Sequence, residues 1–318
     1  MIYTLGFFLH GLKLAQMTSV LIFLASAITI YNFSKAFLRE LNPALPGLIF
    51  LSIPAFTENA NLYTNDLHLA YFTLMAIYCL FLWREKNGNK YVLVAALFTG
   101  LCLATKYIAL ISCLLPFAAL IGYFLIKGEK PFKGWVKTFT LFFVPAFLVF
   151  SPWAIKNLIF TGNPFYPAFF NIFGGRDMSG EVYAVIQSMS GKPALAEGFN
   201  SFISNAWGIF LDSPKEMNIK YGASSYLSPL LLMFAPPVLF IKKRNERYNV
   251  LVVVFLIMFI CWNFTFPITR FFYPAIIILV FLAAFTFTAL YKAASKAVKY
   301  ILGATLVFYI LFGIILGF

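Results

Sequence analysis

Five charged side chains lie in or beside long apolar stretches: Glu58, Asp66, Lys106, Lys156 and Arg270. A charge in such surroundings is costly unless it faces water, an anion or an opposite charge. A carboxylate can remove a proton from a hydroxyl group, and lysine and arginine bind phosphate. We therefore weigh a structural and a chemical role for each of these residues.

The segment TENANLYTNDLH (57–68) carries two carboxylates and no lysine or arginine. Asp66 precedes an apolar run, where it could cap a helix and favour its positive end. Glu58 could be an ordinary loop residue. Alternatively, both carboxylates line a cavity at the membrane surface, where they orient a sugar hydroxyl, bind a cation or hold Lys106. The residues alone leave both interpretations open.

Lys106 lies within GLCLATKYIALI, with apolar residues on both sides. The run 91–126 is too long for a single membrane span, so we expect a break near this lysine. Lys106 would then lie at a hairpin. There it either reaches the lipid headgroups or binds a ligand phosphate.

Two further cations lie near prolines and aromatic residues. Arg270, in FPITRFFYP, is the only charge between residues 248 and 291, and we place it at a helix start. It either anchors that helix at the interface or grips phosphate with its guanidinium. Lys156 follows an apolar span in SPWAIKNLIFTGNPFYP, where prolines break the helix. This segment is an interfacial elbow, and Lys156 and Asn157 could face inward as a cavity wall.

The composition places these residues in a membrane protein. Of 318 residues, 62% are hydrophobic and 11% are charged, against about 25% charged in soluble domains. We therefore predict an all-α, polytopic transmembrane helical bundle with about ten membrane passages. The single integral-membrane domain covers 1–318, and some of its short runs would be paired short helices. The apolar runs are 12–33, 43–57, 66–83, 91–104, 107–126, 138–153, 227–241, 248–264, 271–290 and 300–318.

Charge alternates between the breaks in these runs. Five segments carry 16 Lys and Arg against 4 acidic residues, while the remaining breaks carry 8 against 7. Cytoplasmic loops are rich in lysine and arginine, which places the five segments in the cytoplasm and argues against nucleic-acid binding. The five segments are 34–42, 83–90, 127–137, 242–247 and 291–299.

The polar segments between the other apolar runs then share the extracytoplasmic face: 57–68, 105–106, 154–226 and 264–274. The longest of them, 154–226, is an outer loop containing surface helices, and apolar spacing predicts one of these over 199–210. Four cysteines lie within apolar runs and two histidines lie far apart, so neither a disulfide nor a histidine metal site is expected. Three cations near carboxylates on one face fit an amphiphilic anion such as a sugar-bearing polyprenyl phosphate. Spacing alone leaves a transporter open.

Four segments resemble the GT-C glycosyltransferases, in particular the bacterial branch similar to protein mannosyltransferases and aminoarabinose transferases (glycosyltransferase family 39-like). The elbow is the most specific match, and Phe271 stands where the family more often has tyrosine. The resemblance extends through nearly the whole chain. The segments are NLYTNDLHLAYFTLMAIYCLFLW, GLCLATKYIALISCLLP, PWAIKNLIFTGNPFYPAFFNIFGG and TRFFYPAIIILV.

The resemblance implies inverting transfer of a sugar from a polyprenyl-phosphate donor to a glycan, lipid or protein acceptor. It implies a multi-pass protein of the inner membrane with its active face in the periplasm. No cofactor is implied, and a divalent cation is left open. The chain begins where the family's second span would, so we expect the first span and its acidic loop to be missing. The alternatives are a transporter or flippase of lipid-linked glycans, and a non-catalytic fragment. The implied site comprises the catalytic carboxylates Asp66 and Glu58, and the substrate-binding residues Lys106, Lys156, Asn157, Arg270, Tyr273 and Tyr63.

Overall fold

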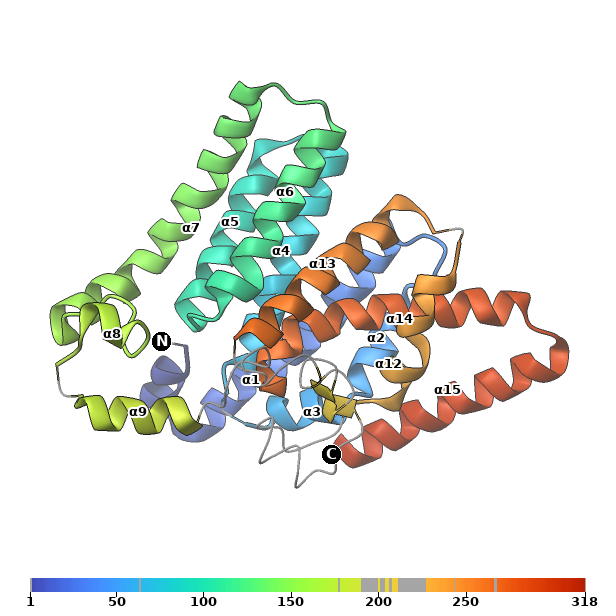
Figure 1. Cartoon of the computed structure of the whole chain (residues 1–318). Coiled ribbons are helices and arrows are strands. Elements are labelled where there is room, and N and C mark those ends of the chain that lie inside the picture. Colours follow the sequence, from blue (N-terminus) through green and yellow to red (C-terminus); the bar gives the residue numbers. More distant parts are fainter. Residues whose placement is uncertain are drawn as a thin grey trace.

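A computed structural model describes the chain over residues 2–62, 64–176, 178–189, 200, 204–205, 208–210, 227–242, 244–265 and 268–317. Within these ranges the chain forms helices and no β-strand (Figure 1). Seven of the helical segments are long and apolar enough to cross a membrane. They are α1 (Ile2–Phe37), α4 (Asp66–Lys86), η1 (Leu110–Leu114) with α6 (Leu115–Lys127), α7 (Phe132–Thr161), α13 (Glu246–Phe264), η4 (Thr269–Phe272) with α14 (Tyr273–Ala293), and α15 (Lys296–Gly317).

The three remaining apolar runs form shorter helices, which is why seven spanning helices replace the expected ten or so. Run 43–57 becomes the pair α2 (Ala44–Leu51) and α3 (Pro54–Ala60), because Ile53 before the proline is extended. Run 91–104 becomes α5 (Asn89–Thr105), about 25 Å long. Run 227–241 is divided at its prolines into α12 (Pro229–Phe234) and η3 (Pro236–Phe240). The paired short helices expected from the sequence are thus present.

Four of the five basic segments, 34–42, 83–90, 242–247 and 291–299, meet at one end of the bundle. Hydrogen bonds and one ion pair join these segments to one another, and a further hydrogen bond joins 242–247 to α6. They are Asn245 Nδ2 to Glu40 Oε1 (2.6 Å), Lys292 Nζ to the carbonyl of Glu40 (3.3 Å), Arg247 with Glu85, and Tyr123 Oη of α6 to Glu246 Oε1 (2.8 Å). The clustering agrees with one shared compartment for these segments. Figure 1 shows α8 (Phe170–Phe173) and α9 (Gly180–Met189) at the opposite end from the α6–α7 turn.

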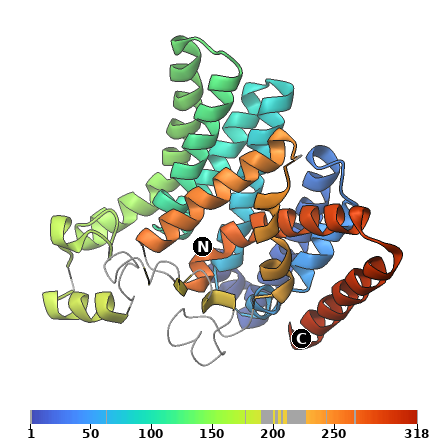
Figure 2. The ribbon, with the colours of Figure 1, turned by 45° about the vertical axis from the view of Figure 1, so that its right-hand side comes forward.

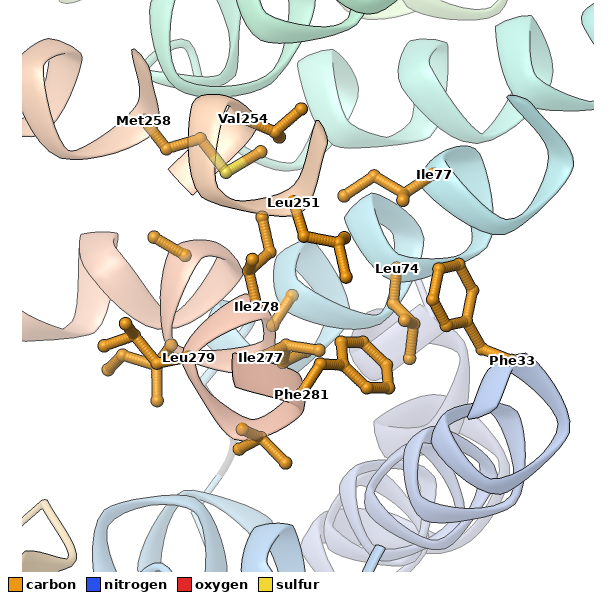
Figure 3. Packing of buried hydrophobic residues seen from close by; sticks show 14 of the residues in the cluster. Phe33, Leu74, Ile77, Leu251, Val254, Met258, Ile277, Ile278, Leu279 and Phe281 are labelled. Atoms are coloured by element: carbon orange, nitrogen blue, oxygen red, sulfur yellow. The ribbon is translucent and has the colours of Figure 1, made fainter. Parts of the chain in front are cut away.

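Helix α14 lies at the centre of the packing. Figure 3 shows Ile277, Ile278 and Phe281 of α14 packed beside Leu74 of α4 and Leu251 of α13. By contrast, α7 and α15 are the least buried of the spanning helices, and both views place them on opposite sides of the molecule (Figure 2). Their exposed apolar side chains suit contact with lipid.

A close helix crossing sets the geometry of the site. Helix α5 packs against both α4 and α7. At Gly100 the backbone of α5 approaches α7 so closely that a Cβ atom would lie 2.5 Å from the carbonyl oxygen of Ala146 and 2.6 Å from Cβ of Val149. Small residues permit such approaches between membrane helices. This crossing brings the end of α5 beside the end of α7.

Candidate functional site

Lys106 forms an ion pair with Asp66. Helix α5 ends at Thr105, so Lys106 lies in the hairpin that its charge predicts. Its Nζ atom binds Oδ1 of Asp66 in the first turn of α4, while Asn65 Nδ2 donates to the carbonyl of Thr105 (3.2 Å). The Asp66 side chain is 2% exposed and that of Lys106 18%, so the pair is largely desolvated. Of the roles considered for Asp66, the structure shows the one of holding Lys106.

Arg270 lies close to the same lysine. The ring of Phe271 lies 4.6 Å from Lys106 Nζ and 5.9 Å from the guanidinium carbon of Arg270. Desolvation lowers the pKa of Lys106, Asp66 opposes this effect, and the charge of Arg270 lowers the pKa further. Arg270 is exposed, immediately before the start of α14. Two positive charges therefore lie close to one aromatic ring, an arrangement that an anion would stabilise.

A second polar group connects α3 with the start of α14. Asn59 Nδ2 donates to the hydroxyl of Tyr273 (2.8 Å), and that hydroxyl donates to the carbonyl of Ala55 (3.2 Å). Tyr273 is fully buried, so it fixes α14 against α3 and does not line the cavity described below. Tyr63, which the resemblance places at the substrate, lies outside the described residues.

Glu58 occupies the last turn of α3 rather than a loop. Its Oε2 atom is buried and has no hydrogen-bond partner among the described residues. Tyr273 is hydrogen-bonded to Asn59, the residue after Glu58, and to the carbonyl of Ala55 one turn earlier, so Glu58 lies near the start of α14. A buried carboxylate oxygen without a partner is costly and is often a functional group.

The elbow after α7 places a second set of side chains beside Lys106. The hydroxyl of Tyr107 accepts hydrogen bonds from Trp153 Nε1 (2.8 Å) and from Asn157 Nδ2. Asn157 is buried and faces inward, as the sequence suggests. Lys156 does not, and that expectation is corrected: Lys156 is exposed, with Nζ 4.4 Å from the Trp153 ring. Consecutive helical residues point about 100° apart, so both could not face inward.

Asn163 holds the elbow together. Helix α7 ends at Thr161, and Gly162 adopts the left-handed conformation (φ 78°) that glycine accepts readily. Asn163 is fully buried, its Nδ2 donates to the carbonyls of Ala168 (2.8 Å) and Gly174 (3.0 Å), and its Oδ1 accepts from the backbone N–H of Phe165 (2.9 Å). These bonds hold the Phe165 ring against Tyr107, 6.1 Å between centroids.

A cavity of 580 Å³ lies between the α5–η1 hairpin, the elbow and the α13–α14 connection. Its volume lies within the usual range for ligand sites, roughly 300–1,000 Å³. Lys106 is the charged residue of the lining, which is otherwise mainly apolar and aromatic. Its aromatic residues are Tyr107, Trp153, Phe169, Tyr183 and Phe271.

The residues predicted from the sequence therefore fall into two groups. Asp66, Lys106 and Arg270 are brought together, with Glu58 nearby, whereas Lys156 is exposed and lies close to the Trp153 ring. Sequence reasoning missed Tyr107 and Phe271 as site residues, although each directly follows a predicted cation. Within the described ranges, no three His, Cys, Asp or Glu side chains gather closely enough to hold a metal ion.

A model of one protein family, described as a domain of unknown function (DUF8201), matches residues 2–277. The chain belongs to this family. No curated protein sequence matches this DUF8201 chain significantly.

Two solved structures share its fold, both of ArnT from Cupriavidus metallidurans. The structure bound to undecaprenyl phosphate has a TM-score of 0.62 at 17% identity and covers 96% of this chain and 52% of ArnT. The apo structure has a TM-score of 0.60 at 17% identity, with coverage of 95% and 50%. The DUF8201 chain thus spans about half the length of ArnT. The shared fold and the apolar helices confirm the all-α, polytopic membrane fold predicted from the sequence.

Proposed function

We propose that this protein transfers a sugar from a polyprenyl-phosphate carrier to an acceptor on the extracytoplasmic side of the membrane. The observation that carries the proposal is the pair of cations, Lys106 and Arg270, that lie close to the ring of Phe271, with Lys106 and Phe271 in the lining of a cavity of 580 Å³. The fold of ArnT, solved with undecaprenyl phosphate, adds support. Inverting sugar transfer and the family 39-like branch of the GT-C enzymes belong to the same proposal.

The cations would bind the carrier phosphate and stabilise it as it leaves. When the bond between the anomeric carbon and the phosphate oxygen breaks, negative charge develops on that oxygen, and fixed positive groups stabilise this charge. Desolvation strengthens such interactions and lowers the pKa of Lys106, so a bound dianion would restore the favourable charge balance. Asp66 would act as a positioning residue that holds Lys106 in one orientation.

Glu58 is the better of the two candidate bases. The carboxylate of Asp66 is occupied by Lys106, whereas Oε2 of Glu58 has no hydrogen-bond partner among the described residues. In the proposed step, the acceptor hydroxyl oxygen attacks the anomeric carbon and its proton passes to Glu58. The bonding electrons of the broken bond remain on the phosphate, and Glu58 later releases the proton to water.

The remaining surfaces suit the same substrate. The cavity wall is mainly apolar and aromatic, as an isoprenoid chain requires. The site lies away from the basic segments, whose clustering we assign to the cytoplasmic side by the positive-inside rule. We place the protein in the inner membrane with this site facing the periplasm. The acceptor is a glycan, a lipid or a protein.

The decisive experiment measures transfer and donor hydrolysis by the purified protein in nanodiscs. Undecaprenyl phosphate bearing mannose, glucose or 4-amino-4-deoxyarabinose serves as donor. We expect Lys106→Ala and Arg270→Ala each to lower turnover at least roughly 100-fold. Lys296→Ala, at an exposed lysine on α15, is the matched control and should leave turnover unchanged. Unaltered transfer in both site variants would refute the proposal, and movement of intact donor between leaflets without cleavage would identify a flippase.

The base is tested separately with Glu58→Gln. The amide keeps the shape of the side chain but accepts no proton, so turnover should fall while the affinity for undecaprenyl phosphate stays the same. Glu129→Gln, in the α6–α7 turn, is the matched control. If Asp66→Asn abolishes turnover with unchanged phosphate affinity and Glu58→Gln does not, the roles assigned to the two carboxylates are reversed.

A further inference from the structure

The Tyr107 hydroxyl has both of its acceptor positions filled. Trp153 Nε1 donates to it (2.8 Å), and Asn157 Nδ2 donates to it from the next turn of α7. A phenol oxygen carries one proton to donate and two lone pairs to accept with. The remaining group is therefore the O–H itself, and no acceptor for it is present among the described residues.

That proton is retained at neutral pH. Burial raises the pKa of Tyr107, and the hydrogen bonds from Trp153 and Asn157 offset only part of this increase. The two accepted bonds also polarise the O–H group, which makes it a stronger donor. The phenol is thus a neutral donor whose direction is set by two neighbours.

Two aromatic rings fix the position of the Tyr107 ring. Phe150 of α7 and Phe165 of the elbow meet it edge to face, with centroids 6.3 Å and 6.1 Å away. Tyr107 directly follows Lys106, and both line the cavity of 580 Å³. The unsatisfied donor therefore shares a cavity with a desolvated cation.

We propose that the Tyr107 hydroxyl donates a hydrogen bond to a non-bridging oxygen of the carrier phosphate beside Lys106, and that Trp153 and Asn157 are positioning residues that aim it. The identity of the ligand rests on the proposed function. An anionic oxygen accepts stronger hydrogen bonds than a neutral one. Among the described residues, those that line the cavity include no carboxylate and no side-chain amide, the groups that usually bind sugar hydroxyls. Phosphate is therefore the better partner for this donor.

In this proposal the elbow after α7 positions the Tyr107 hydroxyl. The residues of its Pro-Trp and Asn-Pro motifs are not themselves the phosphate ligands. Trp153 and Asn157 contact the hydroxyl, and Asn163 folds the turn that presses Phe165 against the ring. The strongest sequence motif of the chain would thus act through one phenol group.

The test compares two lipids that differ only in the phosphate: undecaprenyl phosphate and undecaprenol. Their affinities for wild type and Tyr107→Phe are measured in nanodiscs. We expect the variant to lose roughly tenfold or more in affinity for undecaprenyl phosphate and to bind undecaprenol as wild type does. Tyr123→Phe, which removes a phenol hydroxyl at the opposite end, should change neither affinity.

Trp153→Phe tests the positioning role, since it removes the indole N–H and keeps an aromatic ring. Its loss of phosphate affinity should be smaller than that of Tyr107→Phe, and the double variant should lose no more than Tyr107→Phe alone. Additive losses would overturn the positioning role.

The remaining outcomes distinguish a failure of the Tyr107 assignment from a failure of the proposed function. Equal weakening toward both lipids in Tyr107→Phe would mean a structural role and overturn the proposal. A third ligand, undecaprenyl phosphate bearing mannose, is measured in the same way. A loss of affinity seen only with this sugar-bearing lipid would assign the hydrogen bond to a sugar oxygen, again overturning the proposal. If wild type fails to prefer the phosphate, the proposed function fails together with this inference. If wild type prefers it and Tyr107→Phe keeps that preference, only the assignment to Tyr107 fails.

Discussion

Replacing Asp66 by Asn tests the ion pair on which the site depends. At a separation of about 3 Å and an effective dielectric constant of about 20, the Coulomb attraction of such a pair is about 5.5 kcal/mol. Much of this offsets desolvation, and breaking a buried pair by removing one partner costs about 3–5 kcal/mol. Lys106 keeps 18% of its side-chain surface exposed, so we expect the lower value, about 3 kcal/mol. That corresponds to a fall in Tm of about 4–5 °C.

The dependence of this cost on pH identifies its cause. Without Asp66, the pKa of Lys106 falls further below its ordinary value of 10.5, because desolvation and Arg270 remain. The unfolded chain then binds more protons than the folded one, so the free energy of unfolding rises with pH. In Asp66→Asn, Lys106 can avoid a buried unpaired charge by releasing its proton. From the ordinary pKa of 10.5, at about 1.36 kcal/mol per pH unit, this release limits the loss of stability to about 4.8 kcal/mol at pH 7 and about 2.0 kcal/mol at pH 9.

The assay is thermal unfolding of wild type, Asp66→Asn and the double variant Asp66→Asn, Lys106→Met in the same detergent at pH 7 and pH 9. The difference in Tm between Asp66→Asn and wild type should shrink as the pH rises. The double variant should unfold at a higher temperature than Asp66→Asn at pH 7, because no orphaned charge remains. A penalty that is absent, or equal at both pH values, would refute a desolvated Lys106–Asp66 pair.

Three further predictions concern the surroundings of this pair. Gly100→Ala should destabilise the protein by about 1–3 kcal/mol through overpacking against Ala146, whereas Gly303→Ala, with open space around its Cβ, should be neutral or slightly stabilising in thermal unfolding. The affinity for undecaprenyl phosphate, measured as a function of pH, should fall at an alkaline pH below 10.5, the ordinary pKa of lysine, because Lys106 loses its proton there. Lys106→Arg should remove this fall, and a variant with the same pH dependence as wild type would exclude Lys106 as the titrating group. Asn163→Ala should cost about 2 kcal/mol and speed proteolysis after α7, and equal proteolysis rates would mean that the turn does not depend on its hydrogen bonds.

Much of the fold was predictable because charges are rare in this chain. Lys106 interrupts a run too long for one span, and the structure ends α5 one residue before it. Pro274, at the second position of α14, places the helix start next to Arg270. The clustering of the basic segments followed from their alternation with neutral breaks. Each of these predictions depends on the energetic cost of a charge in an apolar run or of a proline within a helix. That cost can be judged at one position without knowing which residues pack against it.

The details of the site depend on contacts that sequence spacing does not encode. Asp66 and Lys106 are 40 residues apart, and their pairing follows from the packing of α4 against α5. Tyr107 accepts two hydrogen bonds because the close crossing at Gly100 brings the end of α7 to the hairpin that carries this tyrosine. Lys156 was misplaced because its charge was weighed without the 100° helical rotation that separates it from its neighbour.

The most direct measurement is a cryo-electron microscopy structure of the protein in nanodiscs with undecaprenyl phosphate. We expect density for the phosphate in contact with Lys106 and Arg270, with the hydroxyl of Tyr107 directed at one of its oxygens. The isoprenoid chain should leave along the apolar wall of the same cavity. A phosphate bound among the basic segments at the opposite end, or a lipid that leaves Lys106 paired with Asp66 alone, would contradict the account.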